Sequence, residues 1–198
     1  MNTQDFPRFS VFPRGFQVGD RAVPDNKPCM TVTLREVYDY ILHDAGARLA
    51  TQTLRERHLQ PRNASRFKLL NFETATFSCT CTYRKEGYVT SVNNLLVLDF
   101  DHVGGSRALT MLRSSLLHDD CFDTQMLFVS PSGDGLKWVI EVEDWCGMSR
   151  PDFFQSLSNY IASAHHHRPD PSGKDVTRLC FLPHDPNCFI NPRYTQKP

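Results

Sequence analysis

Residues 95–103 read LLVLDFDHV, an apolar run that ends in two aspartates separated by one residue. The apolar part predicts a buried β-strand. Successive side chains of a strand alternate between its two faces, so Asp99 and Asp101 are expected to point the same way. Two like charges held side by side are unfavourable unless a cation lies near them. The stretch therefore predicts either a metal site at a strand end or a strand end that is simply solvated.

The composition is that of an ordinary globular protein. The chain has 198 residues, of which 40% are hydrophobic and 22% charged, enough for one large domain or two small lobes with a shared core. Lys and Arg equal Asp and Glu in number, which excludes a generally basic protein; a contact with nucleic acid would need a local basic patch. The seven cysteines form no C-x-x-C pair, and no apolar run approaches the roughly 18 residues of a membrane span. We therefore expect a reduced, cytoplasmic protein with no membrane partner.

Helical and strand patterns alternate along the chain. Thr33 and Glu36 form a capping box that predicts a helix over about 33–45. Later segments predict, in order, strands over 72–83, the strand at 95–100, a helix over 106–118, a hairpin of MLFVS (126–130) and LKWVIEVE (136–143), a helix from 149, and a last strand TRLCFLP (177–183). From residue 95 onward this is the β–α–β–β–α–β order of an RRM-like or ferredoxin-like module. We expect an α+β fold with an N-terminal arm and α/β lobe (1–94) and an RRM-like module (95–198), in one compact unit.

Three polar clusters lie at the ends of the predicted strands and would converge on one face if the first strand and the hairpin are neighbours. They are Asp99 with Asp101; the hairpin residues Ser132, Gly133, Gly135 and Lys137; and the segment from Asp170 to Arg178. Asp99 and Asp101, with a third carboxylate from Asp170, could hold two Mg²⁺ or Mn²⁺ ions about 3.5–4 Å apart for phosphoryl displacement. Glycine N–H groups could approach phosphate oxygens, and Lys137 and Arg178 would offset the charge of a triphosphate.

Residues 54–68 carry a run of basic side chains with a single acidic one. The basic residues are Arg55, Arg57, Arg62, Arg66 and Lys68. Most such runs are solvated faces, but this one is also the obvious candidate patch for contacts with nucleic-acid phosphates.

Several separated blocks resemble, in order and spacing, one known family. The blocks are SVF (10–12), TLREVYDYI (33–41), 77–83, LLVLDFDHV, SPSGDGLKWVI (130–140) and DVTRLCFLPHDPNCFINP (175–192). They resemble the VirE N-terminal-like domain of the archaeo-eukaryotic primase–polymerase superfamily, from proteins of bacterial mobile elements. The resemblance implies a primase–polymerase-like fold and metal-dependent addition of nucleotides on a DNA template during replication of a mobile element. It also implies a nucleoside triphosphate, single-stranded DNA, and a helicase or C-terminal replication domain as partners.

The resemblance also implies residue roles. Asp99 and Asp101 match the first motif of the superfamily, Asp170 matches the third, and Arg178 matches an arginine that contacts the phosphates of the incoming nucleotide. Ser132 and Lys137 fall on the second motif, where the superfamily usually has His in place of Lys137.

Two departures from the superfamily pattern concern its second and third motifs. Lys137 keeps a positive charge but, unlike His, cannot transfer a proton near neutral pH unless it is strongly desolvated. Pro169 precedes Asp170 where an apolar strand residue is expected, so Asp175 is an alternative third ligand.

Two other functions fit parts of the sequence. LLVLDFDHV also resembles the first motif of haloacid-dehalogenase-type phosphatases, with Ser130, Lys137 and Asp170 or Asp175 in the remaining roles. Ser130 and Lys137 are, however, separated by a single hairpin, with no room for the helix of an α/β crossover. The other alternative is a catalytically silent primase-like domain that binds single-stranded DNA or a protein partner, which Lys137 in place of His favours.

Overall fold

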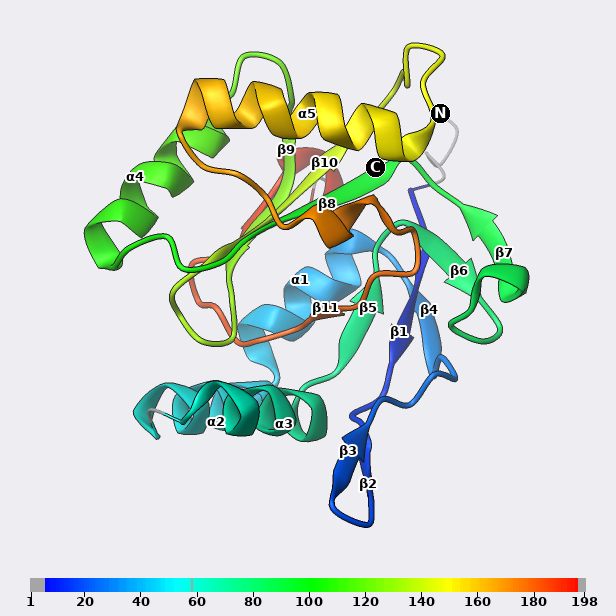
Figure 1. Cartoon of the computed structure of the whole chain (residues 1–198), viewed down its shortest axis with the longest axis vertical. Coiled ribbons are helices and arrows are strands. Elements are labelled where there is room, and N and C mark those ends of the chain that lie inside the picture. Colours follow the sequence, from blue (N-terminus) through cyan, green and yellow to red (C-terminus); the bar gives the residue numbers. More distant parts are fainter. Residues whose placement is uncertain (1–5, 58, 196–198) are drawn as a thin grey trace.

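The apolar run forms a strand, β8 (Leu95–Phe100), at one edge of an antiparallel sheet. The computed structural model describes residues 6–57 and 59–195 and has a mixed α+β fold (Figure 1). This sheet has the strand order β12-β9-β10-β8 and also contains β9 (Thr124–Val129), β10 (Leu136–Glu141) and β12 (Phe189–Ile190). The predicted hairpin is confirmed as β9–β10, and β10 pairs with β8 on its other side.

A second four-stranded antiparallel sheet comes mainly from the N-terminal part of the chain. Its order is β11-β5-β1-β4, with β1 (Phe9–Phe12), β4 (Met30–Val32), β5 (Thr74–Thr76) and β11 (Cys180–Phe181). Two small hairpins extend from it: β2 (Phe16–Val18) with β3 (Arg21–Val23), and β6 (Cys79–Cys81) with β7 (Val89–Val92). In the N-terminal arm the sequence FSVF (9–12) predicts one short strand, which β1 confirms, and the structure adds β2, β3 and β4.

The helices predicted around the capping residues are confirmed. Thr33 and Glu36 form the expected capping box of α1 (Leu34–His43), and the Ser149 side chain caps α5 (Arg150–His165). The helix predicted over 106–118 is α4 (Ser106–Leu117). Residues 45–71 form two further helices, α2 (Ala45–Glu56) and α3 (Pro61–Asn71), which carry the basic run. None of the helices in the described residues is long and apolar enough to cross a membrane.

The alternation of side chains along β8 and β10 divides the interior into two hydrophobic clusters. Even-numbered residues such as Leu98 and Trp138 pack under α4 and α5, which lie together on one face of the sheet (Figure 1). Odd-numbered residues such as Leu95 and Val139 pack against Phe9 and its neighbours in the other sheet. Asp99 and Lys137 follow the odd-numbered alternation, so their side chains lie on the face that is turned toward the other sheet. The predicted parts 1–94 and 95–198 thus share one core.

The last predicted strand was placed wrongly. The 177–183 segment was expected to complete the RRM-like layer, but its β-structure is limited to β11, which pairs with β5 in the other sheet. The fourth strand beside β9 is β12, at the edge opposite β8. The free edge of β8 is instead covered by the turn η2 (Pro171–Lys174) and the residue before it, because the backbone N–H of Asp170 donates to the carbonyl oxygen of Asp99.

Candidate active site

The two charged residues at the centre of the candidate site are cross-strand neighbours. Lys137 on β10 lies directly opposite Asp99 on β8 in the antiparallel register, a placement that brings opposite charges together. Lys137 Nζ contacts Asp99 Oδ1 and lies 3.9 Å from Asp101 Oδ1. Lys137 is only 7% exposed, so its ammonium group faces the carboxylates and not the solvent.

The burial of this pair changes the pKa of both groups. Burial raises the pKa of Asp99 above its usual range, although the neighbouring Lys137 acts in the opposite direction. Burial on its own would lower the pKa of Lys137, but the attraction of Asp99 and Asp101 outweighs it and raises that pKa. Lys137 therefore stays charged at neutral pH and acts as the counter-ion of the two aspartates.

The third predicted carboxylate joins this pair from the distant end of the chain. The backbone hydrogen bond from Asp170 to Asp99 holds Asp170 at the edge of β8, close enough for its charge to act on Asp99. Asp170 Oδ1 accepts a hydrogen bond from the Ser172 N–H at 2.7 Å and is also contacted by the Ser172 hydroxyl. Burial would raise the pKa of Asp170, but these donors hold it below its usual range. Of the two alternatives for the third motif, the structure brings Asp170 next to Asp99.

Asp175 occupies a different position. Its Oδ1 accepts hydrogen bonds from the backbone N–H and the hydroxyl of Thr177, so it caps a turn. Its charge acts on Cys79 and on Arg150, whose pKa is lowered to about 10, chiefly by burial. Asp175 does line the pocket described next, but its side chain is already engaged in the turn.

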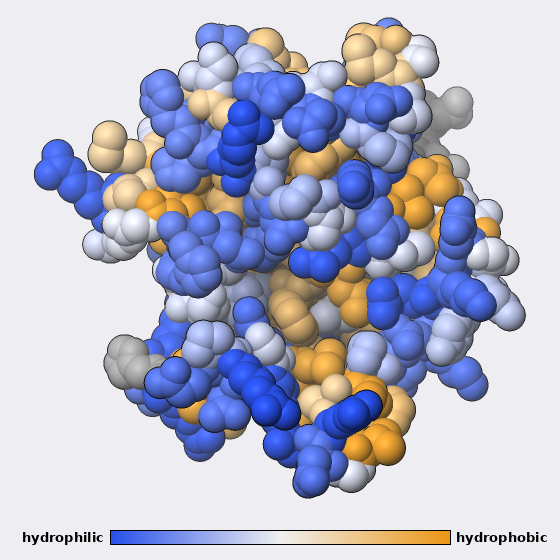
Figure 2. Space-filling model, in the orientation of Figure 1, coloured by the Kyte–Doolittle hydropathy of each residue, from blue (hydrophilic) through white to orange (hydrophobic). Residues whose placement is uncertain are grey.

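A narrow pocket opens beside the carboxylates, between β8 and the segment that follows η2. Asp99, Ser172, Arg178 and Cys180 are among the residues that line it. Arg178 is exposed and its charge reaches Asp170, whereas Cys180 is buried, which raises the pKa of its thiol to about 12 and leaves it protonated. Figure 2 shows the same face of the molecule hollowed near its centre, above the α2–α3 layer. Arg178 is therefore the predicted cation that is free to meet an anionic ligand.

The loop between β9 and β10 is held against the end of β8. A Cβ atom on Gly135 would lie 2.2 Å from the carbonyl oxygen of Phe100, so only glycine allows this approach of two backbones. Gly133 has a φ of 84°, in the left-handed region that favours glycine. The two glycines predicted to bind phosphate thus have structural roles that place the loop beside Asp101.

Arg55 was predicted as a possible nucleic-acid contact, and the structure gives it another role. Its guanidinium group donates to the carbonyl oxygens of Pro131 (3.2 Å) and Ser130 (3.1 Å), so it ties α2 to the β9–β10 loop. Partial burial of its guanidinium group lowers the pKa of Arg55, although the residue as a whole stays exposed. Arg55 therefore positions the loop with two of its hydrogen-bond donors.

The other basic residues of the run remain at the surface or near it. Arg62 and Arg66 lie one helical turn apart on α3 and line a groove whose opposite wall is β3 with Arg21. Lys68 lies 5.9 Å from the ring centroid of Phe181, a cation–π contact, and Arg57 is exposed at the end of α2. Among the predicted contacts, Arg62 and Arg66 are the two that share one groove.

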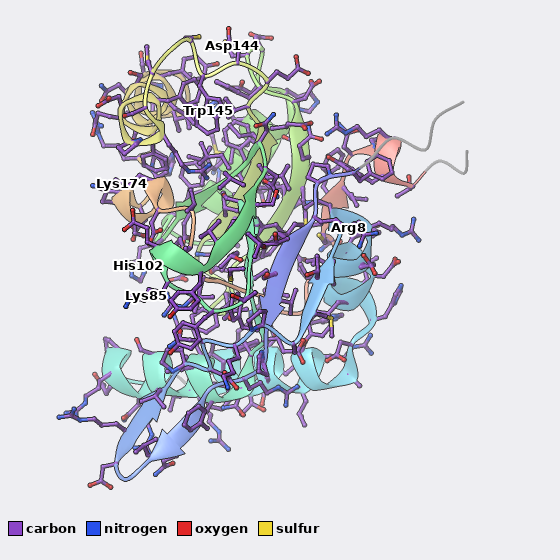
Figure 3. All side chains as sticks on the ribbon, turned by 90° about the vertical axis from the view of Figure 1, so that its right-hand side faces the viewer. Arg8, Lys85, His102, Asp144, Trp145 and Lys174 are labelled. Carbon is purple, nitrogen blue, oxygen red and sulfur yellow. The ribbon has the colours of Figure 1, made fainter. Side chains whose placement is uncertain are left out.

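His102, next to the second aspartate, was not among the predicted site residues. It has a φ of 54°, which is rare for a residue other than glycine, and its Nδ1 lies 2.7 Å from Asp134 Oδ2. Ser132 donates to the other carboxylate oxygen of Asp134 at 2.6 Å, so Ser132 is engaged within the loop. Burial alone would raise the pKa of Asp134, but the contacts from Ser132 and His102 lower it. In Figure 3, His102 lies beyond the end of β8, on the same side of the molecule as Lys174.

A second polar cluster lies between α4 and α5, away from the three predicted clusters. His165 Nε2 is 2.7 Å from Asp119 Oδ2, and His165 Nδ1 is 2.7 Å from the hydroxyl of Ser115. This order of groups resembles a catalytic triad, but Ser115 lies in the last turns of α4, where the backbone carbonyls make the environment negative. An oxyanion would be disfavoured there, so the cluster is a contact between two helices.

The carboxylates fit a divalent ion only in part. Among the described residues, no three His, Cys, Asp or Glu side chains are arranged to hold a metal ion by themselves. Magnesium sites commonly use one or two carboxylates, and substrate phosphates complete the coordination. Asp99 Oδ1 is buried against the Lys137 ammonium group, whereas the Asp101 side chain is 52% exposed. The Asp101 carboxylate, with the other oxygen of Asp99, fits an ion that a phosphate ligand helps to hold.

Comparison with known proteins places the chain in a family. A family model for the BT4734-like, N-terminal domain matches residues 71–189, from the last residue of α3 to the first residue of β12. No curated protein and no solved structure matches the chain. The matched segment contains all three polar clusters, but the match indicates no activity, and the link to primase–polymerases stays a prediction. Because the match covers 119 of the 198 residues, the chain belongs to the BT4734-like, N-terminal domain family.

Proposed function

We propose that this domain is a nucleotidyltransferase of the primase–polymerase type, which adds nucleotides to a strand paired with a DNA template. One observation carries the proposal: Asp99, Asp101, Lys137, Asp170 and Arg178, from three separate segments, lie close enough for their charges to interact, and Asp99 and Arg178 line one narrow pocket. Buried charges of both signs are costly to assemble and are more common at functional sites than elsewhere. A nucleoside triphosphate has the charge that suits this arrangement, because its phosphates could meet both an exposed arginine and a metal ion held by carboxylates.

Different residues of the site would bind the metal ion and the phosphates of the nucleotide. Asp99 and Asp101 would hold Mg²⁺ or Mn²⁺, which when bound neutralises charge on phosphate oxygens and on the attacking hydroxyl. Arg178, exposed at the pocket, would bind phosphate oxygens with its planar fork of donors. Asp170 holds the β8 edge and the segment carrying Arg178 together, because its backbone binds Asp99 and its carboxylate attracts Arg178.

The template would follow the surface on which α2 and α3 lie. Arg21, Arg62 and Arg66 line the groove between α3 and β3 and face a single carboxylate, that of Asp20. Phe16 on β2 is 52% exposed and belongs to the same hairpin, where it could stack on a base. Figure 2 shows strongly hydrophilic and hydrophobic side chains next to one another over this part of the molecule. Affinity for single-stranded DNA at such a groove would be modest and salt-dependent.

The two alternative functions differ in how well the fold supports them. All strand pairings among the described residues are antiparallel, whereas a haloacid-dehalogenase-type phosphatase needs a parallel sheet with helical crossovers. The fold therefore argues against the phosphatase. A silent domain that binds single-stranded DNA keeps the arginine groove but gives no role to the gathered carboxylates.

The test is nucleotide incorporation on a single-stranded DNA template, with and without a primer, in Mg²⁺ or Mn²⁺. Asp101→Asn should reduce incorporation by about a hundredfold or more, because it removes charge from the reacting centre. Asp175→Asn is the matched control: it alters a carboxylate of the same pocket that the structure engages in a turn, and it should retain most activity. Equal losses in both variants, or no product from the wild type, would refute the proposal. Template binding without any product would identify the silent binding domain.

A further inference from the structure

We infer that Lys137 takes the place of one of two metal ions, so that the site accepts a single divalent ion, together with the nucleotide. This inference rests on the proposed nucleotidyl transfer and specifies its metal requirement. Carboxylate-rich phosphoryl-transfer sites commonly hold two ions. Here a side chain of the protein already occupies the position between the carboxylates.

The position of Lys137 is set by the sheet. Because Lys137 pairs opposite Asp99 in the β8–β10 register, its ammonium group points toward the aspartates. Nζ contacts Asp99 Oδ1 and is 3.9 Å from Asp101 Oδ1, so its positive charge lies beside both carboxylates that would hold a metal ion. The Lys137 side chain is 8% exposed, and the buried Cys180 lies close enough for the charge of Lys137 to act on the pKa of its thiol. Lys137 is therefore a permanent part of the site.

The charges of the site are consistent with one ion. Three carboxylates alone carry three negative charges, and two divalent ions would leave them with a net charge of plus one. Lys137 and Arg178 reduce the three negative charges to one, so that one divalent ion gives a net charge of plus one, whereas two ions beside these cations would give plus three. A second ion would meet the ammonium group at contact distance, and repulsion at that distance in a partly buried site is strong.

The small number of carboxylate oxygens that are free to bind a metal also favours a single ion. Asp101 is the more exposed of the three carboxylates, while Asp170 Oδ1 is already engaged by the N–H and hydroxyl of Ser172. Too few free carboxylate oxygens remain for two ions in the nucleotide-free protein. Phosphate oxygens would have to complete the coordination of the one ion, so metal and nucleotide should bind together.

The test is Mn²⁺ binding, followed by electron paramagnetic resonance, with and without a non-hydrolysable nucleoside triphosphate. The wild type should bind one Mn²⁺ per chain, at least tenfold more tightly with the nucleotide than without it. Lys137→Met should bind Mn²⁺ at least tenfold more tightly than the wild type in the absence of nucleotide, because the carboxylates have lost their counter-ion. Lys137→Arg, which keeps the charge, should resemble the wild type.

Two results would overturn the inference. One is binding of two Mn²⁺ per wild-type chain in the presence of the nucleotide, a measurement that does not depend on whether the variants fold. The other is unchanged Mn²⁺ affinity in a folded Lys137→Met protein. Two bound ions with normal nucleotide incorporation would overturn the role of Lys137 alone. One bound ion without incorporation would overturn the proposed function while the role of Lys137 as a cation in the site remains.

Discussion

The pair formed by Lys137 and Asp99 gives a prediction about stability that needs no substrate. Replacing Lys137 with Met keeps the length of the side chain but leaves the Asp99 carboxylate without its counter-ion. The Lys137 and Asp99 side chains are 8% and 19% exposed, respectively. Removing one partner of a fully buried ion pair costs about 3–5 kcal/mol. Because Asp99 retains some contact with water, we expect Lys137→Met to lower the free energy of unfolding by about 2–3 kcal/mol at pH 7.

The loss of stability should become much smaller when the unpaired charge of Asp99 is removed as well. The double variant Lys137→Met with Asp99→Asn has no unpaired charge at this position of the sheet, and it should recover at least half of the lost stability. Urea unfolding of the wild type, both single variants and the double variant measures this coupling directly. The midpoint should change while the slope stays constant, since all four proteins expose about the same additional surface when they unfold.

The pH dependence has a defined sign. Burial already raises the pKa of Asp99 in the folded protein, and the loss of Lys137 would raise it further. A carboxyl group with a raised pKa binds more protons when folded than when unfolded, so its protonation stabilises the folded state. The stability deficit of Lys137→Met should therefore be largest at pH 7 and shrink as the pH falls toward about 4, the ordinary range of an Asp carboxyl. A deficit that is independent of pH, or that survives in the double variant, would show that Lys137 stabilises the sheet by packing and not as a counter-ion.

Two further predictions concern the loop between β9 and β10. Gly135→Ala should destabilise the protein by about 2 kcal/mol or more, because its Cβ would collide with the backbone of β8; Gly87→Ala, where a Cβ meets nothing within 4 Å, should be close to neutral. Thermal unfolding compares the two, and an equal melting temperature for both variants would contradict the role of Gly135. Arg55→Ala should cost about 1.5–3 kcal/mol and speed amide exchange in loop 130–135, since two hydrogen bonds from a charged donor are lost. The exposed Arg57→Ala is its control, and unchanged loop exchange in Arg55→Ala would refute the anchoring role.

Local patterns in the sequence were sufficient for several elements of the fold. The capping box at Thr33 predicts α1 because its hydrogen bonds involve residues only three positions apart. The apolar run and the Gly-containing loop predict β8 and the β9–β10 hairpin for the same reason. Asp170 was predicted as a site residue from the polar cluster at 170–178 and again from the resemblance to a family.

Contacts between distant segments decided what local patterns left open. Whether Asp170 or Asp175 lies beside Asp99 depends on which of them binds the free edge of β8, and the Asp170 backbone does so. The same occupied edge explains why the last predicted strand could not complete the RRM-like layer and why β11 pairs with β5 instead.

The sequence by itself determined that Asp99 and Asp101 end one strand on the same face and that Lys137 lies on another strand, because periodicity along a strand is a local property. Only the tertiary structure decided that Lys137 is buried opposite Asp99, since β8 and β10 pair although α4 and β9 separate them in the sequence. It likewise decided that Arg55, the first arginine of the basic run, donates hydrogen bonds to the loop at Ser130 and Pro131. The physical reason is the same in both cases: periodicity and capping act over a few residues, whereas the partner of a charge depends on segments that meet only when the chain has folded.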